Sequence, residues 1–250
     1  MTPIFRRRAN RVKLIAEISF ELGKGRRRLE QAMEFLKPGS PYSGIDIPES
    51  PLGNPSINSV VVGSILKSSF PESIVFSHLR LIDVSRVMFL SLLSAASELS
   101  GIDALFLTLG EGKERRSASK ISTEEAFKIA EEHGLEERLG AIISLRYSLS
   151  EIEKRLGSGF KKFLVLRLSQ GNMDKFAEVS RLAMRRNVEL YPYIIVKTEK
   201  NEKVLEQLGQ PSLSPSELPD MLKAIEKRAD GAVISTAGDL KSLRAIWQSF

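Results

Sequence analysis

The chain has 250 residues, a formal net charge of +6 at pH 7 and no cysteine. This length suffices for one large α/β barrel or for two smaller domains, and the absence of cysteine excludes disulfides, thiolate catalysis and cysteine-ligated metal centres. The two histidines, His78 and His133, are too few for a histidine-rich metal site.

Basic residues occur in scattered doublets and triplets rather than in one tail. Such charges usually lie on solvated helix surfaces, although attraction for a phosphate-bearing ligand stays open. Few aromatic residues accompany them, which disfavours a nucleic-acid partner. No apolar run is long enough to span a bilayer, and residues 1–12 form a basic arm without an apolar secretory core. We therefore expect a cytoplasmic protein without a membrane partner.

Short β-rich runs alternate with segments of helical periodicity along the chain. The expected strands are 13–18, 43–47, 73–77, 104–108, 139–145, 162–168, 188–196 and 229–234. The expected helices are 26–37, 55–69, 83–100, 121–134, 149–157, 172–187, 199–208, 215–227 and 238–248. Asp83, Ser122 and Ser148 are the expected helix caps, and Ser148 with Glu151 forms the pattern of a capping box.

The strands are mostly apolar on both faces, as parallel strands covered by helices should be. Eight strand–helix pairs predict an α/β fold of the (β/α)8 TIM barrel type, with a single domain over residues 13–250. A doubly wound open sheet is the structural alternative.

The usual phosphate-binding and hydrolase motifs are absent: no GxGxxG follows a strand, and neither GxxxxGK[ST] nor a nucleophile elbow occurs. Polar residues at the carboxyl-terminal ends of the strands are therefore the candidate site residues, because barrels of this type bind their ligands at that end of the strands. His78 ends the third expected strand, and Gly110 and Glu111 follow the fourth. Lys154 and Arg155, on the helix after the fifth strand, are by themselves ordinary helix-surface charges.

Glu17 is the most informative of these residues, because it interrupts the apolar run LIAEIS. If its carboxyl faces the barrel mouth, burial raises its pKa and makes it a proton donor near neutral pH. The alternative is a structural acid that pairs with an interior lysine or arginine. The segment GIDIPESPLGNPSINS, residues 44–59, follows the second strand with rigid, turn-forming residues, and we expect it to face a ligand.

Taken in order, these segments resemble the methylenetetrahydrofolate reductase family of flavin-dependent (β/α)8 barrels. LIAEIS resembles the family's first strand, and IDIPESPLGNPSINS resembles the loop after its second. HLRLIDVSR is similar to the family's HLTCxDxNR, and ALFLTLGEG to the strand that ends in Gly-Asp. LSEIEKRLGSGFKKFLV is similar to the family's LxxLxxKxxAGAxxxxT.

The resemblance implies an oxidoreductase of one-carbon metabolism. Reduced FAD would pass a hydride to a methylene-tetrahydropterin, carried by tetrahydrofolate or a related archaeal carrier, with NAD(P)H as the electron donor. It implies that Glu17 protonates a pterin nitrogen and that Glu111 tunes charge near the flavin or pterin. A homo-oligomer or a partner reductase subunit stays open. The residues expected to contact FAD are Pro48, His78, Gly110, Lys154 and Arg155.

The chain also departs from the family pattern. Pro48 stands in place of a threonine, Leu109 in place of an arginine or threonine, and Glu111 in place of an aspartate. Leu166 or Arg167 occupies the position of a folate-facing glutamine. Each unmade hydrogen bond to a buried ligand group costs about 1–3 kcal/mol, so flavin and substrate binding should be weakened. The second interpretation is therefore a divergent, non-catalytic barrel that binds a ligand or serves as a regulatory or scaffold subunit.

Overall fold

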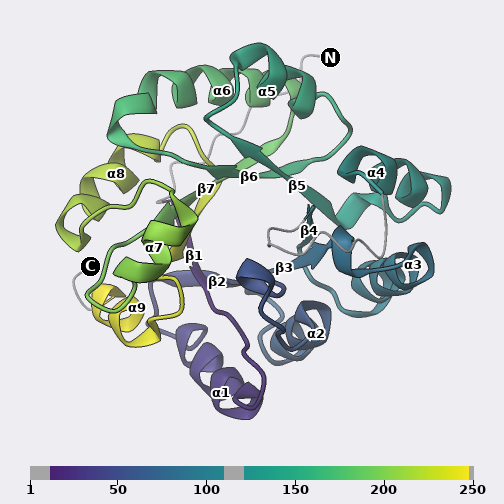
Figure 1. The fold of residues 1–250 in the computed structure, drawn as a ribbon, viewed down its shortest axis with the longest axis horizontal. Helices are drawn as coiled ribbons and strands as arrows, with labels where there is room; N and C mark the ends of the chain where they lie inside the picture. Colours follow the sequence, from purple (N-terminus) through teal and green to yellow (C-terminus); the bar gives the residue numbers. More distant parts are fainter. Residues whose placement is uncertain (1–11, 110–120, 248–250) are drawn as a thin grey trace.

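A computed structural model of the protein describes residues 12–109 and 121–247. The described residues form a closed parallel barrel in which each strand pairs with the next and β8 pairs with β1 (Figure 1). The predicted (β/α)8 TIM barrel is confirmed. Its strands are β1 (Lys13–Glu17), β2 (Tyr42–Ile47), β3 (Ile74–Arg80), β4 (Ala104–Thr108), β5 (Leu139–Ser144), β6 (Lys162–Leu166), β7 (Glu189–Ile195) and β8 (Gly231–Ser235).

Helices surround the barrel on its outside (Figure 1). In the described part of the chain they are α1 (Gly25–Phe35), α2 (Ser59–Ser69), α3 (Arg86–Ser94), α4 (Thr123–Glu132), α5 (Leu149–Leu156), α6 (Met173–Arg186), α7 (Glu202–Leu208), α8 (Leu218–Ile225) and α9 (Leu240–Trp247). None of these helices combines the length and the apolar character needed to cross a membrane.

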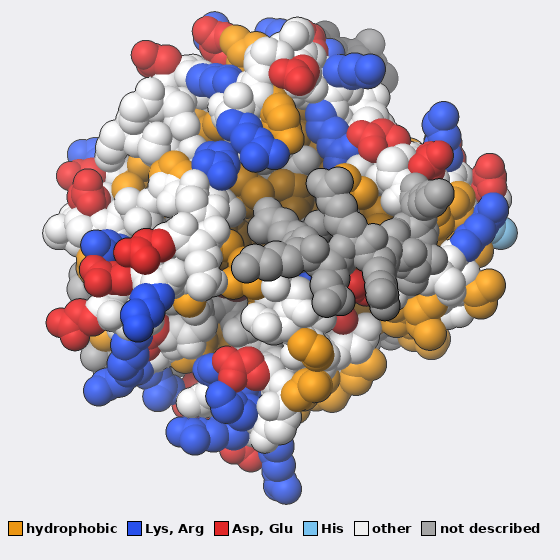
Figure 2. Space-filling view, viewed as in Figure 1, with side chains coloured by type: hydrophobic (Ala, Val, Ile, Leu, Met, Phe, Trp, Pro, Cys, Tyr) orange, Lys and Arg blue, Asp and Glu red, His pale blue; other side chains and the backbone are white. Residues whose placement is uncertain are grey.

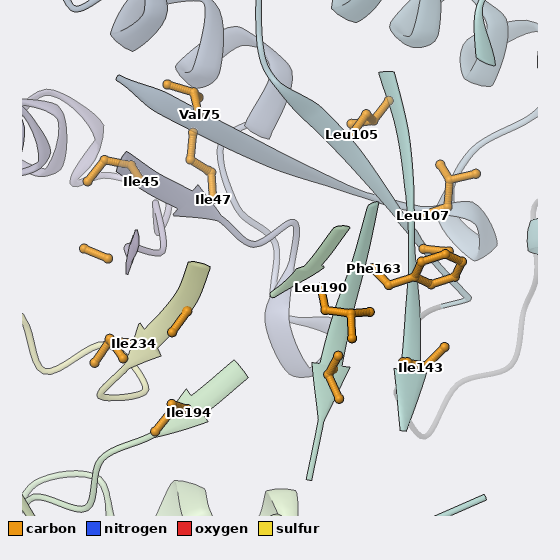
Figure 3. Packing of buried hydrophobic residues seen from close by; sticks show 14 of the residues in the cluster. Ile45, Ile47, Val75, Leu105, Leu107, Ile143, Phe163, Leu190, Ile194 and Ile234 are labelled. Carbon is orange, nitrogen blue, oxygen red and sulfur yellow. The ribbon is translucent and has the colours of Figure 1, made fainter. Parts of the chain in front are cut away.

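Two apolar layers hold the barrel together, because successive side chains of a strand point to opposite faces. The larger layer lies between strands and helices and includes Ile45, Val75, Leu105 and Phe163, all buried (Figure 3). The smaller layer fills the inside of the barrel and consists of Ile15, Phe76, Ala104, Phe106, Leu164, Tyr191 and Val233.

Aromatic rings close the interior of the barrel. Phe76 lies edge-to-face against Phe106 and Tyr191, with ring centroids 5.1 and 4.9 Å apart. Gly140 is the register partner of Phe106 on the next strand, and a Cβ atom there would lie 2.4 Å from the Phe106 ring. Glycine at this position therefore leaves room for the Phe106 ring inside the barrel.

The expected caps are confirmed at two helices and wrong at a third. Ser122 and Ser148 each form a capping box, with Glu125 and Glu151 respectively. Helix α3 begins after Ser85, whose hydroxyl accepts a hydrogen bond from the Met88 amide, whereas the expected cap Asp83 lies in a preceding 3-10 turn.

Several element boundaries also differ from the sequence prediction. Helix α2 begins at Ser59 rather than near residue 55, because Asn58 caps it. The third strand extends to Arg80 instead of ending near residue 77, because β3 continues its pairing with β4 through Arg80 and Thr108. The helix expected over 83–100 is α3 followed by a π-helical turn, Ala95–Leu99.

Candidate functional site

A cavity of about 1010 Å3 lies at the carboxyl-terminal end of the barrel strands. Residues of most strands and of the loops that follow them line it. Figure 2 views this end of the barrel and shows hydrophobic side chains deep in a central hollow, with lysine and arginine side chains near its edge. This is the end at which TIM-barrel enzymes bind their ligands.

Glu17, at the end of β1, is half-buried on the wall of this cavity. The Ser235 hydroxyl at the end of β8 donates to its Oε1 over 2.7 Å, and the Tyr193 hydroxyl on β7 donates to its Oε2. Neither partner carries a positive charge. Within the described ranges no lysine or arginine forms an ion pair with Glu17, so its carboxyl is held by neutral hydroxyl groups.

Burial is the main cause that raises the pKa of Glu17 above its ordinary value. The neighbouring negative charge of Asp46 raises the pKa further, while the hydrogen bonds from Tyr193 and Ser235 lower it in part. The net upward shift favours the protonated acid, which is the form a proton donor requires.

Asp46 is the register partner of Glu17 on β2 and is fully buried. Its Oδ1 lies 2.8 Å from Nε2 of His78, and its Oδ2 has no hydrogen-bond partner in the described part of the chain. Burial lowers the pKa of His78, but the charge of Asp46 and the hydrogen bond to it outweigh burial, so the net shift is upward. An Asp–His pair therefore lies directly beside Glu17.

His78 is buried on β3 and lines the cavity. Its ring also lies against Phe106, with centroids 5.7 Å apart. The prediction that His78 ends its strand is wrong, because β3 continues for two further residues. That extension places Arg80 on the cavity wall as well.

The loop after β2 forms one side of the cavity mouth, where Pro48, Glu49 and Leu52 are among the lining residues. Backbone conformation and hydrogen bonding fix this loop. Ser50 and Leu52 have left-handed backbones, with φ of 42° and 56°, and the Ser50 amide donates to the Ser56 hydroxyl over 2.9 Å. Since Pro48, Glu49 and Leu52 line the cavity, the loop that we expected to face a ligand lies at the mouth of that cavity.

Two further contacts anchor this loop to the barrel. The amide of Ser59 donates to Oε2 of Glu49 over 2.7 Å, and Nη1 of Arg80 donates to the Ser50 carbonyl over 2.5 Å. Burial raises the pKa of Glu49, and the hydrogen bonds from Ser59 oppose that rise. Glu49 thus brings a further carboxyl to the Glu17 side of the cavity.

The opposite side of the cavity carries arginines. Arg155 on α5 pairs with Glu124 on α4, and its Nε donates to the Ile142 carbonyl over 3.4 Å. Arg146 stacks over the Tyr147 ring at 4.8 Å and donates to its hydroxyl over 2.7 Å. All of these residues line the cavity. Leu107, Ile142, Leu164 and Leu166 contribute an apolar wall to the same cavity.

The structure brings together only some of the predicted site residues. Glu17, Pro48, His78 and Arg155 line one cavity. Lys154 does not: it is exposed on the outer side of α5 and is absent from the lining. Its position in the helix turns it outward, one residue before the inward Arg155. Gly110 and Glu111 lie outside the described residues.

Sequence reasoning missed Asp46, Glu49, Tyr193 and Ser235, which surround Glu17 and His78. Asp46 carried a usable signal, because it interrupts the apolar strand GIDI as Glu17 interrupts LIAEIS. Tyr193 and Ser235 carried little signal, since tyrosine and serine are common at strand ends. Among the described residues, no group of three or more His, Asp or Glu side chains could hold a metal ion.

No protein family and no curated protein matches the sequence. Among solved structures, a Clostridium thermocellum protein that binds two copies of 5-methyl-5,6,7,8-tetrahydrofolic acid shares the fold, with a TM-score of 0.66 and 12% identity over 96% of this chain and 95% of that one. A protein from Aquifex aeolicus VF5 matches with a TM-score of 0.59 and 11% identity over 95% of this chain and 91% of that one. At these identities the likeness shows the fold alone.

Proposed function

We propose that the chain binds a reduced pterin of the folate class in the cavity at the mouth of the barrel, and that Glu17 donates a proton to it. The observation that carries this proposal is the state of Glu17. A carboxyl with a raised pKa, held by two hydroxyl groups and by no cation among the described residues, lies on the wall of a cavity of about 1010 Å3. A cavity of this volume lies at the upper end of the range that is usual for small-molecule and cofactor sites.

The distribution of chemical groups in the cavity supports a folate-like ligand. A reduced pterin carries amino and ring N–H donors at one end, an aromatic linker, and the carboxylates of a glutamate tail at the other. Glu17 and Glu49 offer acceptors on one side, while Arg146 and Arg155 offer cations on the other. The apolar wall of the cavity suits the linker. The tetrahydrofolate ligand of the Clostridium thermocellum neighbour supports the same class.

The finer proposal is the reduction of a methylene-tetrahydropterin to the methyl form with FAD. The donor set fits such a cofactor in its chemistry, because Arg146 and Arg155 could pair with phosphates and the apolar wall could cover a flat ring. When bound, the flavin would supply the hydride, with NAD(P)H as its reductant. Lys154, which points away from the cavity, would take no part in holding it.

In this reaction Glu17 gives its proton to the ring nitrogen that separates from the methylene carbon. Tyr193 and Ser235 keep the carboxyl oriented toward the cavity through their hydroxyl groups. The leaving nitrogen would otherwise carry negative charge, so a neutral acid at this point lowers the barrier. A proton donor of this kind typically accelerates a reaction by about 10²- to 10⁴-fold.

A second candidate function is pterin binding without reduction. It is favoured by Pro48, Leu109 and Leu166, which line the cavity at positions where the resembling family has polar side chains. Apolar residues at these points leave polar groups of a flavin or pterin without partners, which weakens binding. A barrel that binds the ligand as a carrier or regulatory subunit would tolerate such changes.

Titration of the purified protein with 5-methyl-tetrahydrofolate, and separately with FAD, tests the proposal. We expect saturable binding of the folate, and yellow protein after FAD is added. Glu17→Gln should then slow reduction of a methylene-tetrahydropterin by about 10²- to 10⁴-fold, while reduction of the flavin by NAD(P)H survives. Folate binding without FAD uptake would support the second candidate, and failure to bind any reduced pterin would overturn both.

A further inference from the structure

The buried Asp46–His78 pair beside Glu17 is not used by the proposed reaction. Asp46 is fully buried, and burying an ionised carboxylate is costly unless it is paired. The one hydrogen-bond partner of its carboxylate among the described residues is the imidazole of His78, at 2.8 Å. The Oδ2 atom of Asp46 has no hydrogen-bond partner among the described residues, so one buried acceptor of the pair is left unsatisfied. Buried polar atoms without a partner are rare in folded proteins and often mark a functional group.

We propose that Asp46 and His78 act as a positioning pair that keeps Glu17 protonated: Asp46 holds the negative charge of the cluster, and His78 holds the proton that balances it. The proposal deepens the proposed function, since it explains how Glu17 stays a donor. It assigns Asp46 no contact with the ligand, because that side chain is fully buried.

The geometry of the strands supports this assignment. Glu17 and Asp46 are register partners on adjacent parallel strands, so two carboxyls lie side by side in the barrel. Like charges at such a position cannot both be ionised cheaply, and one of the two retains a proton. Only Asp46 contacts an imidazole, whereas Glu17 contacts two hydroxyl groups, each of which can also accept a hydrogen bond if its O–H turns away. The charge therefore falls on Asp46 and the proton on Glu17.

Proton counting leads to the same assignment. Neutral Glu17, ionised Asp46 and protonated His78 together carry no net charge, whereas ionising Glu17 would leave one net negative charge in a poorly solvated place. The direction of the shifts agrees, because the pKa values of Glu17 and His78 are both raised.

Three other ionisable groups lie around the cluster. Tyr193 faces Glu17 from β7 with a pKa well above its ordinary value, owing to burial and the Glu17 charge, so it stays neutral. Glu49 faces His78 from the loop after β2, with a pKa raised by burial. Arg80, two residues beyond His78, is engaged by the Ser50 carbonyl and lies 2.8 Å from the Asp83 carboxylate.

Nuclear magnetic resonance titration of the free protein tests the proposal without any ligand. The chain has two histidines, so His133→Gln assigns the His78 imidazole signal, and Glu17→Gln assigns Glu17 in protein labelled on its glutamate carboxyl carbons. In the wild type we expect the titration midpoint of His78 above about 6.5 and that of Glu17 above its ordinary range near 4.3. Asp46→Asn should shift both midpoints downward.

Glu189→Gln is the matched control. Glu189 lies at the opposite end of β7, where it accepts a hydrogen bond from Tyr191 much as Glu17 does from Tyr193. This variant should leave both midpoints unchanged. A Glu17 midpoint that does not move in Asp46→Asn would overturn the proposal. If Asp46→Asn does not fold, the wild type decides, because a His78 that titrates below its ordinary value contradicts the proposal.

The titration test of the Asp46–His78 pair and the binding test of the proposed function can fail independently of each other. A protein that binds no reduced pterin yet shows the Asp46-dependent midpoints would retain this inference and lose the folate proposal. In an active enzyme, Asp46→Asn should also move the alkaline limb of the pH–rate profile to lower pH, a change that mere loosening of the barrel would not produce.

Discussion

Glu17 combines burial with neutral hydrogen-bond partners, and this combination governs its behaviour at the scale of a single residue. A carboxyl paired with an interior lysine would be ionised at neutral pH and would stabilise the fold. Burial and the nearby charge of Asp46 lead to the opposite expectation for Glu17, because together they outweigh the hydrogen bonds from Tyr193 and Ser235. Glu17 should therefore destabilise the folded protein at neutral pH while preparing it for proton donation.

The pH dependence of stability tests this expectation. Because the folded-state pKa of Glu17 is raised, the folded protein binds more protons than the unfolded chain between the two pKa values. The free energy of unfolding contributed by Glu17 is then complete at acid pH and falls as pH rises through that window. Relative to Glu17→Gln, the wild type should lose stability between acid and neutral pH, as measured by urea unfolding at each pH.

Glu151→Gln provides a control of opposite sign. Hydrogen bonds from Ser148 lower the pKa of Glu151, so its contribution is present above the ordinary glutamate pKa and is lost as pH falls. The wild type should therefore lose stability relative to this variant on acidification. Parallel behaviour of the two variants would contradict the assignment of Glu17 as a protonated acid.

Catalysis provides a second prediction at the same scale. If the reductase proposal holds, Glu17→Gln should reduce kcat for a methylene-tetrahydropterin by about 10²- to 10⁴-fold, because the leaving nitrogen loses its proton source. Affinity for 5-methyl-tetrahydrofolate should change much less. Steady-state kinetics together with a binding titration would measure the two effects, and a wild-type kcat in the variant would exclude Glu17 as the donor.

At the scale of elements, the ring layer beneath the cavity depends on Gly140. An alanine there would place its Cβ 2.4 Å from the Phe106 ring, which is enclosed by Phe76 and the barrel wall. We expect Gly140→Ala to lower the free energy of unfolding by about 1–3 kcal/mol, as overpacked cores do. Urea unfolding measures the loss, and Phe106→Leu in the same chain should recover part of it.

Gly171→Ala is the matched control for this test, because a Cβ atom there would meet only the Ser169 hydroxyl, at 4.0 Å. It should leave stability nearly unchanged. Equal effects of the two substitutions would show that Gly140 matters for its backbone and not for the space that it leaves to Phe106.

The loop after β2 provides a second prediction for an element. Leu52 adopts a left-handed backbone, which is unfavourable for leucine by roughly 1–2 kcal/mol, and its side chain lines the cavity mouth. Leu52→Gly should therefore keep or raise the melting temperature while weakening ligand binding. Leu22→Gly, at an exposed leucine away from the cavity lining, should slightly lower the melting temperature. Loss of stability in Leu52→Gly beyond that of the control would contradict this account.

Element order could be predicted from the sequence because it depends on local patterns. Apolar runs between helical segments were enough to predict the barrel, and Ser148 with Glu151 was enough to predict where α5 begins. Boundaries that depend on tertiary pairing were not predictable in this way. The extension of β3 to Arg80 follows from pairing with β4. The start of α2 at Ser59 follows instead from the Asn58 cap, a local signal that the sequence prediction did not use.

At the scale of the whole molecule, the residues alone indicated the site only where one of them broke an apolar pattern, and the family resemblance added Pro48, His78 and Arg155. Glu17 broke such a pattern, and the structure places it on the cavity wall. The Asp46–His78 contact joins residues 32 positions apart and depends on strand register, which no local pattern specifies. The sequence also predicted one residue too many. Lys154 and Arg155 are adjacent on a helix and therefore face different directions, and of the two only Arg155 lines the cavity.

The charge distribution connects the site to its expected ligand. The chain as a whole carries a formal charge of +6, which favours approach of an anionic ligand such as a folate with its glutamate tail. Within the cavity Glu17 and Glu49 lie on one side together with Arg80, and Arg146 and Arg155 lie on the other side together with Glu124. A homo-oligomer or a partner reductase subunit stays a prediction.

Calorimetric titration of the wild-type protein with 5-methyl-tetrahydrofolate, repeated in buffers of different ionisation enthalpy, tests whether Glu17 serves as a proton donor in a pterin site. We expect saturable binding whose linked proton exchange changes in Glu17→Gln, because the carboxyl on the cavity wall carries a titratable proton. Absence of binding at any pH, or binding with identical proton exchange in the variant, would contradict this expectation.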